Sequence, residues 1–352
     1  MFSSSLRATL VALCLSAISA SATSELTLKV SGPEAATGVD NLRVKTTFIN
    51  TGDETLHLLN DPRSSLTSTA TDSFRITSSS GATPAFNGLK IKYSPSVAAK
   101  LNSSSITTVL TPGQSIDVEH DLSVAYNFTN SGEDLYDIEA NNKFFLVNPD
   151  TLEVSEISAK QDASHQAKLT GTLSVARSSG LEKRASFVGC SSTEQSQINS
   201  AITAAQNYAN SARDYLSSHT SSTTRYTTWF GTYTSSRHST VLSHFTNIAS
   251  QGYSGYTYDC TCTEEGVFAF VNLNQFGTIH LCPVFWEVST TGTDSKGGTL
   301  IHESTHFTQL AGTDDHVYGQ SGAQSLARSN PDQAIDNADS HEYFAENNPA
   351  QS

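Results

Sequence analysis

Two histidines and a glutamate lie close together near the C-terminal end of the chain, as His302, Glu303 and His306. If this stretch is helical, residues four apart lie one turn above each other, so the two imidazoles can reach the same point. That geometry suits two ligands of a tetrahedral Zn²⁺ ion, with the glutamate beside the open position as a general base. The alternative is a solvated helix with two histidines by chance, and three fixed residues make it the less favoured interpretation.

A catalytic zinc ion with two histidine ligands needs a third protein ligand, which we expect downstream. A metzincin would carry a third histidine six residues after His306, together with a methionine turn. Gly312 stands at that position and Met1 is the only methionine, so the metzincins are excluded. The remaining candidates for the third ligand are Glu342 and Glu346, as in a thermolysin-like site, then His316, and the pair Asp314 and Asp315.

Residues 312–319 follow the predicted helix directly and fit the pattern G-T-x-D-x-x-Y-G. Together with the sequence HESTH, this stretch resembles the aspzincins of the deuterolysin family, in which an aspartate is the third zinc ligand. The resemblance implies that Asp315, not Asp314, binds the metal. We then expect the Tyr318 hydroxyl to point at the developing oxyanion. A glycine behind the helix lets the chain turn back and bring the carboxylate to the metal.

From residue 189 to the C-terminus, the chain is similar to the fungal peptidyl-Lys metalloendopeptidases, which cut on the amino side of lysine. An aspartate and a glutamate line the lysine pocket in that group, and the resemblance assigns this role to Asp339 and Glu342. The two residues are three apart and share one face of a predicted helix. Selectivity for lysine needs negative charge that is at least partly buried. The alternative interpretation is a solvated acidic helix face.

The N-terminus has the features of a secretory signal peptide, which we assign to residues 1–20. Arg7 is its only charge, residues 8–18 form an apolar run, and small residues follow. The run is too short to span a bilayer as a stop-transfer helix, and no other stretch is apolar enough to cross a membrane. We therefore expect a secreted, extracellular protein, with cleavage after Ala20 or Ala22.

Cysteine usage agrees with secretion, because Cys14 leaves with the signal peptide and an even number remains. The remaining cysteines are Cys190, Cys260, Cys262 and Cys282. Two disulfides are expected, and spacing alone allows three pairings. The resemblance to the peptidyl-Lys group implies the pairs Cys190–Cys260 and Cys262–Cys282. Asn102 and Asn127 begin sequons for N-glycosylation.

Residues 25–177 show short alternating segments, such as Leu26, Leu28 and Val30, separated by turn clusters. This pattern predicts an all-β, immunoglobulin-like sandwich. A polar stretch follows, in which Lys183 and Arg184 form a dibasic pair, and exposed linkers are where proteases cut. We expect residues 21–184 to be a propeptide removed by a dibasic-processing protease, with an ordinary surface charge pair as the alternative.

Residues 185–352 change character and predict an α+β, zincin-like catalytic domain. Apolar residues at helical spacing predict helices over residues 192–216 and 239–248. Short strands are expected at 256–259, 267–271 and 278–281, and a last acidic helix at about 332–346.

Charge and lysine usage bear on the partners of the protein. A net charge of −14 argues against nucleic acid and anionic membranes as partners.

After the signal peptide, nine lysines lie between Lys29 and Lys183, whereas Lys296 is the only lysine from residue 185 onwards. An enzyme that cuts before lysine would digest itself at exposed lysines, so this scarcity would protect it. Drift in composition is the alternative cause.

The sequence thus predicts a zinc metalloendopeptidase made as a zymogen, whose partners are lysine-containing proteins and peptides and its own propeptide. The propeptide contains no cysteine, so a thiolate on zinc is excluded as the cause of latency. Covering of the cleft by the β domain and assistance in folding both remain open. The rival functions are a deuterolysin-like protease of broader specificity for basic proteins and a secreted, non-catalytic zinc-binding protein.

Overall fold

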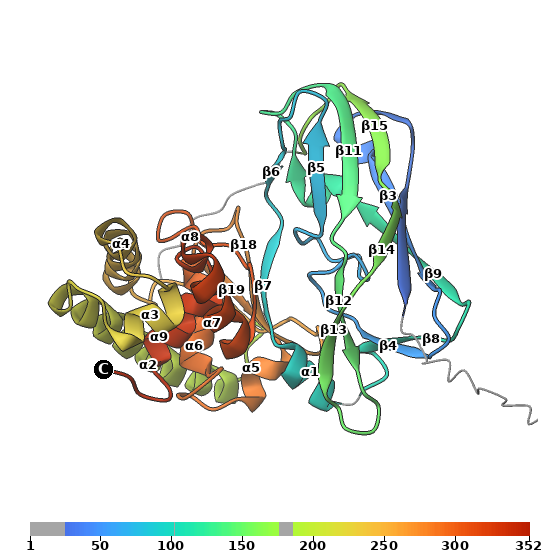
Figure 1. Ribbon diagram of the computed structural model, residues 1–352. Coiled ribbons are helices and arrows are strands. Elements are labelled where there is room, and N and C mark those ends of the chain that lie inside the picture. The colour runs from blue at the N-terminus through green and yellow to red at the C-terminus, as the bar shows by residue number, and fades with distance from the viewer. Residues whose placement is uncertain (1–24, 102, 176–185) are drawn as a thin grey trace, which may run out of the picture.

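The chain folds into a β-rich N-terminal part and a mixed α/β C-terminal part, which lie side by side (Figure 1). The computed structural model describes residues 25–101, 103–175 and 186–352. The predicted signal peptide, the sequon at Asn102 and the dibasic pair Lys183 and Arg184 lie outside the described residues. No helix in the described ranges is long and apolar enough to cross a membrane.

Alternating apolar residues make the N-terminal part a set of stacked sheets, because period-2 patterns bury one face of each strand. The sheet orders are β14-β1-β3-β9, β2-β15-β11-β5, β13-β12-β4-β8 and the pair β10-β6. The inward faces form one apolar cluster that includes Leu28, Phe48 and Phe144. The part is all-β apart from one short helix and two 3₁₀ turns, and its immunoglobulin-like assignment stays a prediction. The elements are β1 (Leu26–Ser31), β2 (Ala35–Thr37), η1 (Val39–Asn41), β3 (Arg43–Asn50), β4 (Leu56–Leu59), β5 (Phe74–Ser78), β6 (Ala85–Phe86), β7 (Leu89–Tyr93), α1 (Pro95–Leu101), β8 (Thr107–Leu110), β9 (Ser115–Asp121), η2 (Leu122–Val124), β10 (Tyr126–Asn127), β11 (Asp134–Ala140), β12 (Lys143–Val147), β13 (Val154–Ser158), β14 (Lys160–Ala163) and β15 (His165–Thr170).

The C-terminal part packs helices against a mixed sheet. Its elements are β16 (Ser186–Val188), α2 (Ser192–Ser218), α3 (Thr224–Phe230), α4 (Ser235–Gln251), β17 (Thr257–Asp259), β18 (Val267–Asn272), β19 (Thr278–Leu281), α5 (Pro283–Glu287), α6 (Lys296–Thr305), α7 (Gly319–Ser329), α8 (Pro331–Ala334) and α9 (Ala338–Glu346). The disulfides Cys190–Cys260 and Cys262–Cys282 both form, and they join the ends of these strands.

Helix α6 lies at the centre of the C-terminal part, and every one of its residues is buried. It packs against α2 and α9, and glycines permit the close approach. A Cβ atom on Gly297 would lie 2.8 Å from the Cβ of Ala204, and one on Gly298 would collide with the carboxylate of Glu346. The Gly-Gly pair before the two histidines therefore lets α6 sit deep in the core.

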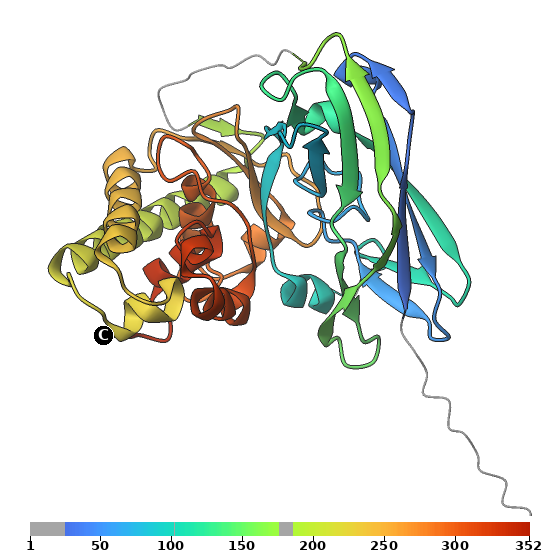
Figure 2. The same cartoon turned by 45° about the horizontal axis from the view of Figure 1, so that its top comes forward.

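Strand β7 belongs to the N-terminal part by sequence, but its hydrogen-bonded partner is the C-terminal strand β18. The five-stranded sheet has the order β16-β17-β19-β18-β7, with β7 antiparallel to β18 at its edge. Figures 1 and 2 show β7 running between the two parts of the molecule. Among the described strands, β18 is the only one that pairs with β7.

The prediction of one acidic helix over residues 332–346 is wrong. The structure has two helices, α8 and α9, interrupted at residues 335–337. The interruption has a tertiary cause, since Asp314 N–H donates to the Asp336 carbonyl and Ala338 N–H donates to the Asp314 carbonyl. The loop behind α6 therefore docks into the gap between the two helices.

Candidate metal centre

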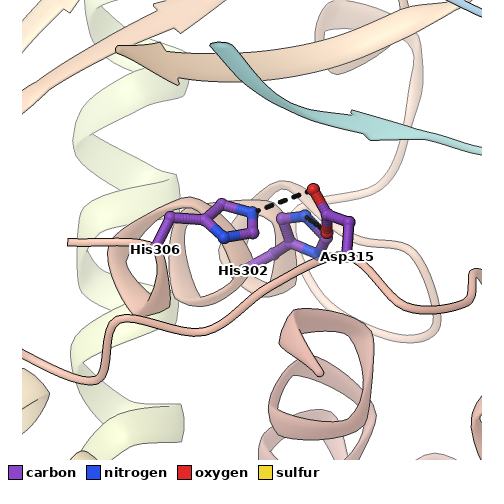
Figure 3. A group of neighbouring side chains, drawn as sticks. All are labelled: His302, His306 and Asp315. Atoms are coloured by element: carbon purple, nitrogen blue, oxygen red, sulfur yellow. Dashed lines mark ion pairs between the residues drawn. The ribbon is translucent and has the colours of Figure 1, made fainter. Parts of the chain in front are cut away.

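Helix α6 brings His302 and His306 together as its periodicity predicts. Their ring centroids lie 4.9 Å apart, and both side chains are fully buried. The helix ends at Thr305, and His306 follows as its C-terminal cap with helical backbone angles. The two rings face the same point beside the helix (Figure 3).

The loop after α6 turns back and places Asp315 opposite the two rings. Gly312 takes a left-handed φ of 67°, and Thr313 N–H then donates to the Thr305 carbonyl. Asn337 fixes the far side of the loop, because its Oδ1 accepts the backbone N–H groups of His316 and Val317. The chain is thus held on both sides of the aspartate.

The Asp315 carboxylate lies between the two histidines, with Oδ1 3.3 Å from His302 Nε2 and Oδ2 3.4 Å from His306 Nε2 (Figure 3). Ligand atoms at 2.0–2.2 Å from a tetrahedral zinc ion are about 3.3–3.5 Å apart, so these separations fit the ion. Both Nε2 atoms are buried and have no hydrogen-bond partner among the described residues. The residues present therefore fit a zinc ion held by two nitrogens and one carboxylate.

The other ring nitrogen of each histidine faces an oxygen atom, but among the described residues only that of His306 makes a hydrogen bond, and His302 Nδ1 makes none. His306 Nδ1 donates to the Thr313 carbonyl at 2.9 Å, and His302 Nδ1 lies 2.8 Å from Asp339 Oδ1. Such partners fix the tautomer and orientation of metal-binding imidazoles. Burial lowers the pKa of His306 to about 4 and so keeps it neutral. At His302, burial opposes protonation, but the surrounding carboxylates raise the pKa well above its usual value.

Glu303 is completely buried next to these ligands. Its Oε1 accepts the backbone N–H of Lys92 at 3.3 Å, and its Oε2 has no hydrogen-bond partner among the described residues. Burial raises the pKa of the Glu303 carboxyl to about 8. The charge of a bound cation would act in the opposite direction. A carboxylate placed in this way can exchange a proton with a group bound beside it.

Tyr318 lies directly before α7, as the N-cap residue of that helix. Its ring stacks on His302 with centroids 6.4 Å apart, and its hydroxyl donates to the Ile91 carbonyl at 3.3 Å. The Arg63 guanidinium lies over the same ring, 3.2 Å from its centroid. The hydroxyl is thus held where a peptide carbonyl lies.

Asp339 and Glu342 lie on α9 behind His302, in a buried acidic pocket that contains the Lys92 ammonium. The Lys92 Nζ donates to Glu342 Oε2 at 2.6 Å and lies 3.9 Å from Asp339 Oδ1. Asp294 is a third carboxylate, 3.4 Å from the same ammonium, and it accepts the Tyr343 hydroxyl. Burial alone would lower the pKa of Lys92, but the three carboxylates raise it well above its usual value.

Asp294 was absent from the sequence-based site. It precedes α6 as a single aspartate with a positive φ of 51°, and no local pattern distinguishes it. Its place in the acidic pocket becomes visible only in the folded chain, where it contacts Lys92 and, on α9, Tyr343. His302, Asp339 and Glu342 could also form a metal site by distance, but the Lys92 ammonium already balances that charge.

The other candidate ligands do not reach the metal centre. His316 Nε2 pairs with Asp336 Oδ2 at 2.9 Å, and Glu346 accepts the Ser295 backbone N–H at 2.9 Å. Asn127 lies in the N-terminal part, in β10, and its Oδ1 accepts the Thr129 N–H. Its glycosylation stays a prediction.

Comparison with known proteins gives close relatives over the whole chain. A family model described as "Lysine-specific metallo-endopeptidase" matches residues 215–346. The chain is 56% identical to the peptidyl-Lys metalloendopeptidase of Armillaria mellea and 54% identical to that of Grifola frondosa, each over 100% of both chains. A solved zinc peptidase from Grifola frondosa is 59% identical, with a TM-score of 0.46, over 46% of this chain and 100% of that one.

Proposed function

The chain belongs to the peptidyl-Lys metalloendopeptidase family, and we propose that it hydrolyses peptide bonds on the amino side of lysine with one catalytic zinc ion. The single observation that carries this proposal is the position of Lys92. Its side chain lies in the acidic pocket, and its backbone N–H donates a hydrogen bond to Glu303. The carbonyl of the preceding residue accepts a hydrogen bond from the Tyr318 hydroxyl. A peptide bond on the amino side of a lysine thus lies between the groups that would cleave it.

The pocket supports selectivity for lysine through its charge. Three carboxylates meet at one point, and an ammonium is a compact point charge that can be shared among them. The rings of Phe268 and Tyr343 lie 4.9 and 5.9 Å from the same ammonium. A neutral side chain in this place would leave buried carboxylates without a counter-charge, which is costly.

Each polar group in the cleft has a role in the proposed reaction. His302, His306 and Asp315 would hold the zinc ion, which when bound supplies an acidified water and polarises the carbonyl. Glu303 takes a proton from the water and passes it to the leaving amine, whose position is that of the Lys92 nitrogen. The Tyr318 hydroxyl donates to the carbonyl oxygen as negative charge develops there.

The proposed function includes a secreted zymogen. Residues 1–20 would be the signal peptide, 21–184 a propeptide cut after Lys183 and Arg184, and 185–352 the active enzyme. Lys296 supports this division, because the only lysine after residue 184 is 6% exposed and its ammonium donates to the Trp286 carbonyl. The enzyme would offer itself no accessible cleavage site.

Mapping the bonds cut in a denatured protein tests the function. The zinc-loaded enzyme of residues 185–352 should cut almost only before lysine and should be inactive with a chelator. Cuts spread over other bonds would favour the broader, deuterolysin-like protease. No cutting by fully zinc-loaded protein would favour a non-catalytic zinc-binding protein.

A further inference from the structure

We propose that strand β7 is an autoinhibitory strand, bound in the cleft as a substrate would be, with the Ile91–Lys92 bond in place of the scissile bond. This inference rests on the proposed function and names how the same site is regulated. Sequence reasoning left open whether the N-terminal part covers the cleft or assists folding. The contacts of β7 favour covering of the cleft.

The backbone of β7 occupies the edge of the catalytic sheet. Asn272 pairs with Leu89, Phe270 with Ile91 and Ala269 with Lys92, all antiparallel. A sheet edge offers unpaired N–H and C=O groups that an extended peptide can complete. In this structure β7 uses the groups of β18 that an incoming substrate strand would need.

Three groups of the C-terminal part converge on Lys92, two of them on the peptide unit between Ile91 and Lys92 and the third on the lysine side chain. Tyr318 donates to its carbonyl at 3.3 Å, and Glu303 accepts its N–H at 3.3 Å. The side chain that follows reaches Glu342 at 2.6 Å. An interface that served packing alone would have no need to place a lysine backbone and side chain on all three groups together.

Charged groups beside β7 hold the strand at the loop that carries the metal ligand. The Lys90 ammonium pairs with Asp314, next to Asp315. Arg63 Nε donates a hydrogen bond to Asp61 Oδ1 at 2.7 Å, and the Arg63 guanidinium stacks over the Tyr318 ring. All of these cations come from the N-terminal part and meet acidic or aromatic groups of the cleft, so the two surfaces are complementary in charge.

Apolar contacts seal the same surface. Ile91, Tyr93 and Ala98 form one buried cluster with Val267 and Cys282 of the C-terminal part. Because the two parts belong to one chain, β7 competes with substrates at a high effective concentration. Cutting the chain between the parts makes this contact bimolecular, so dilution can then release the cleft.

The test uses the whole zinc-loaded precursor with Lys183→Ala and Arg184→Ala, which blocks processing at the dibasic pair. Its kcat/KM on a short peptide is compared with that of the processed enzyme, with chain integrity verified by mass. The substrate in this assay is a short peptide with one lysine. If bond mapping shows that the processed enzyme cuts other bonds, a peptide with one of those bonds is used instead. We expect at most a few per cent of the processed activity. Adding Lys92→Met should raise the activity of the intact precursor at least tenfold, and the matched control Lys168→Met, on an exposed position of β15, should not change it.

A precursor as active as the processed enzyme, or a folded Lys92→Met precursor as latent as its parent, would overturn the inference. If Lys92→Met does not fold, a binding measurement replaces it. The Glu303→Gln change is made in both the precursor and the processed enzyme, and the affinity of each for a labelled substrate peptide is measured. The precursor should bind this peptide at least tenfold more weakly than the processed variant. Equal affinities would overturn the inference. Latency of the precursor and the cleavage specificity of the processed enzyme are measured separately. The results can therefore contradict autoinhibition by β7 and still support cleavage before lysine, or support autoinhibition and contradict that specificity.

Discussion

The Lys92 ammonium lies 2.6 Å from Glu342 Oε2, and 250 positions of the chain separate the two residues. One comes from a β-strand of the N-terminal part and the other from the last helix, and both are fully buried. A buried charge is tolerated where a partner balances it. The pair therefore supports the proposal that this acidic pocket receives the lysine side chain of a substrate.

Replacing Glu342 by Gln should weaken cleavage before lysine in the processed enzyme. Removing one partner of a buried ion pair costs about 2–5 kcal/mol, so kcat/KM for lysine peptides should fall by at least about 30-fold. Asp294→Asn should have a smaller effect, because its carboxylate lies 3.4 Å from the ammonium. Asp332→Asn, an exposed change on α8, is the matched control. Unchanged kinetics in Glu342→Gln would remove this residue from the lysine pocket.

The neighbouring aspartates 314 and 315 allow a matched test of the metal site. Asp315→Asn should lose zinc at chelator concentrations that leave the wild type loaded, because one of three protein ligands is weakened. Asp314→Asn should keep its zinc, since that carboxylate faces Lys90 and not the histidines. Zinc content after dialysis measures both. Equal zinc content in the two variants would contradict the assignment of the third ligand.

Glu303→Gln should keep the zinc ion and lose nearly all activity. Loss of a general acid–base group costs about 10²–10⁴-fold in rate. Gln has nearly the same shape, and its amide can still meet the Lys92 backbone in the precursor. Metal analysis and kcat on a lysine peptide separate the two effects, and a variant with wild-type kcat would show that another group moves the proton.

Tyr318→Phe should reduce kcat with little change in KM. The phenylalanine ring would still stack on His302, so packing beside the metal site would be preserved. The hydroxyl that donates to the carbonyl oxygen would be lost. Removal of one oxyanion donor costs about 10²–10³-fold in kcat. Steady-state kinetics on a lysine peptide measure this. A rise in KM at constant kcat would instead mean that the hydroxyl only binds the ground state.

Acid should destabilise the catalytic part through a buried histidine pair. His244 Nδ1 donates to His341 Nε2 at 3.0 Å, and His341 Nδ1 donates to the Asn337 carbonyl. Burial, followed by the neighbouring His244, lowers the pKa of His341 to about 3. The unfolded chain then binds more protons, so this stabilisation is complete above about pH 6.5 and falls by up to about 1.4 kcal/mol per pH unit below it.

Urea unfolding of chelator-treated enzyme between pH 7 and 4.5 measures this dependence. His341→Asn should be less stable at pH 7 but should show a shallower loss of stability on acidification. The exposed change His219→Asn should retain the wild-type slope. The same slope in all three proteins would contradict a role of the buried pair.

Local patterns were sufficient for the ligand types and for much of the secondary structure. Histidines four apart on an apolar helix share a face in any fold, so His302 and His306 could be paired from the sequence. Asp315 and Tyr318 follow within one loop of that helix, where a glycine turn restricts the path of the chain. In the structure the Asp315 carboxylate oxygens lie 3.3 and 3.4 Å from the Nε2 atoms of His302 and His306.

Local patterns give no sign that Lys90 and Lys92 are buried. In the sequence Leu-Lys-Ile-Lys-Tyr the lysines alternate with apolar residues, and that pattern indicates a strand with its charged face in water. The structure buries both faces, because β7 leaves its own part and pairs with β18. Three carboxylates balance the charge of the buried Lys92 ammonium.

The sequence by itself predicted a helix with two histidines on one face and an acidic segment behind it, because those residues are neighbours along the chain, whereas Asp315 was chosen among several candidate third ligands through the family resemblance. Only the tertiary structure decided that Asp294 approaches the Lys92 ammonium, that a gap between α8 and α9 holds the Asp315 loop, and that β7 lies against Glu303 and Tyr318. These contacts join segments far apart in the sequence. Their free energy depends on shape, burial and charge balance in the assembled molecule, which no local periodicity encodes.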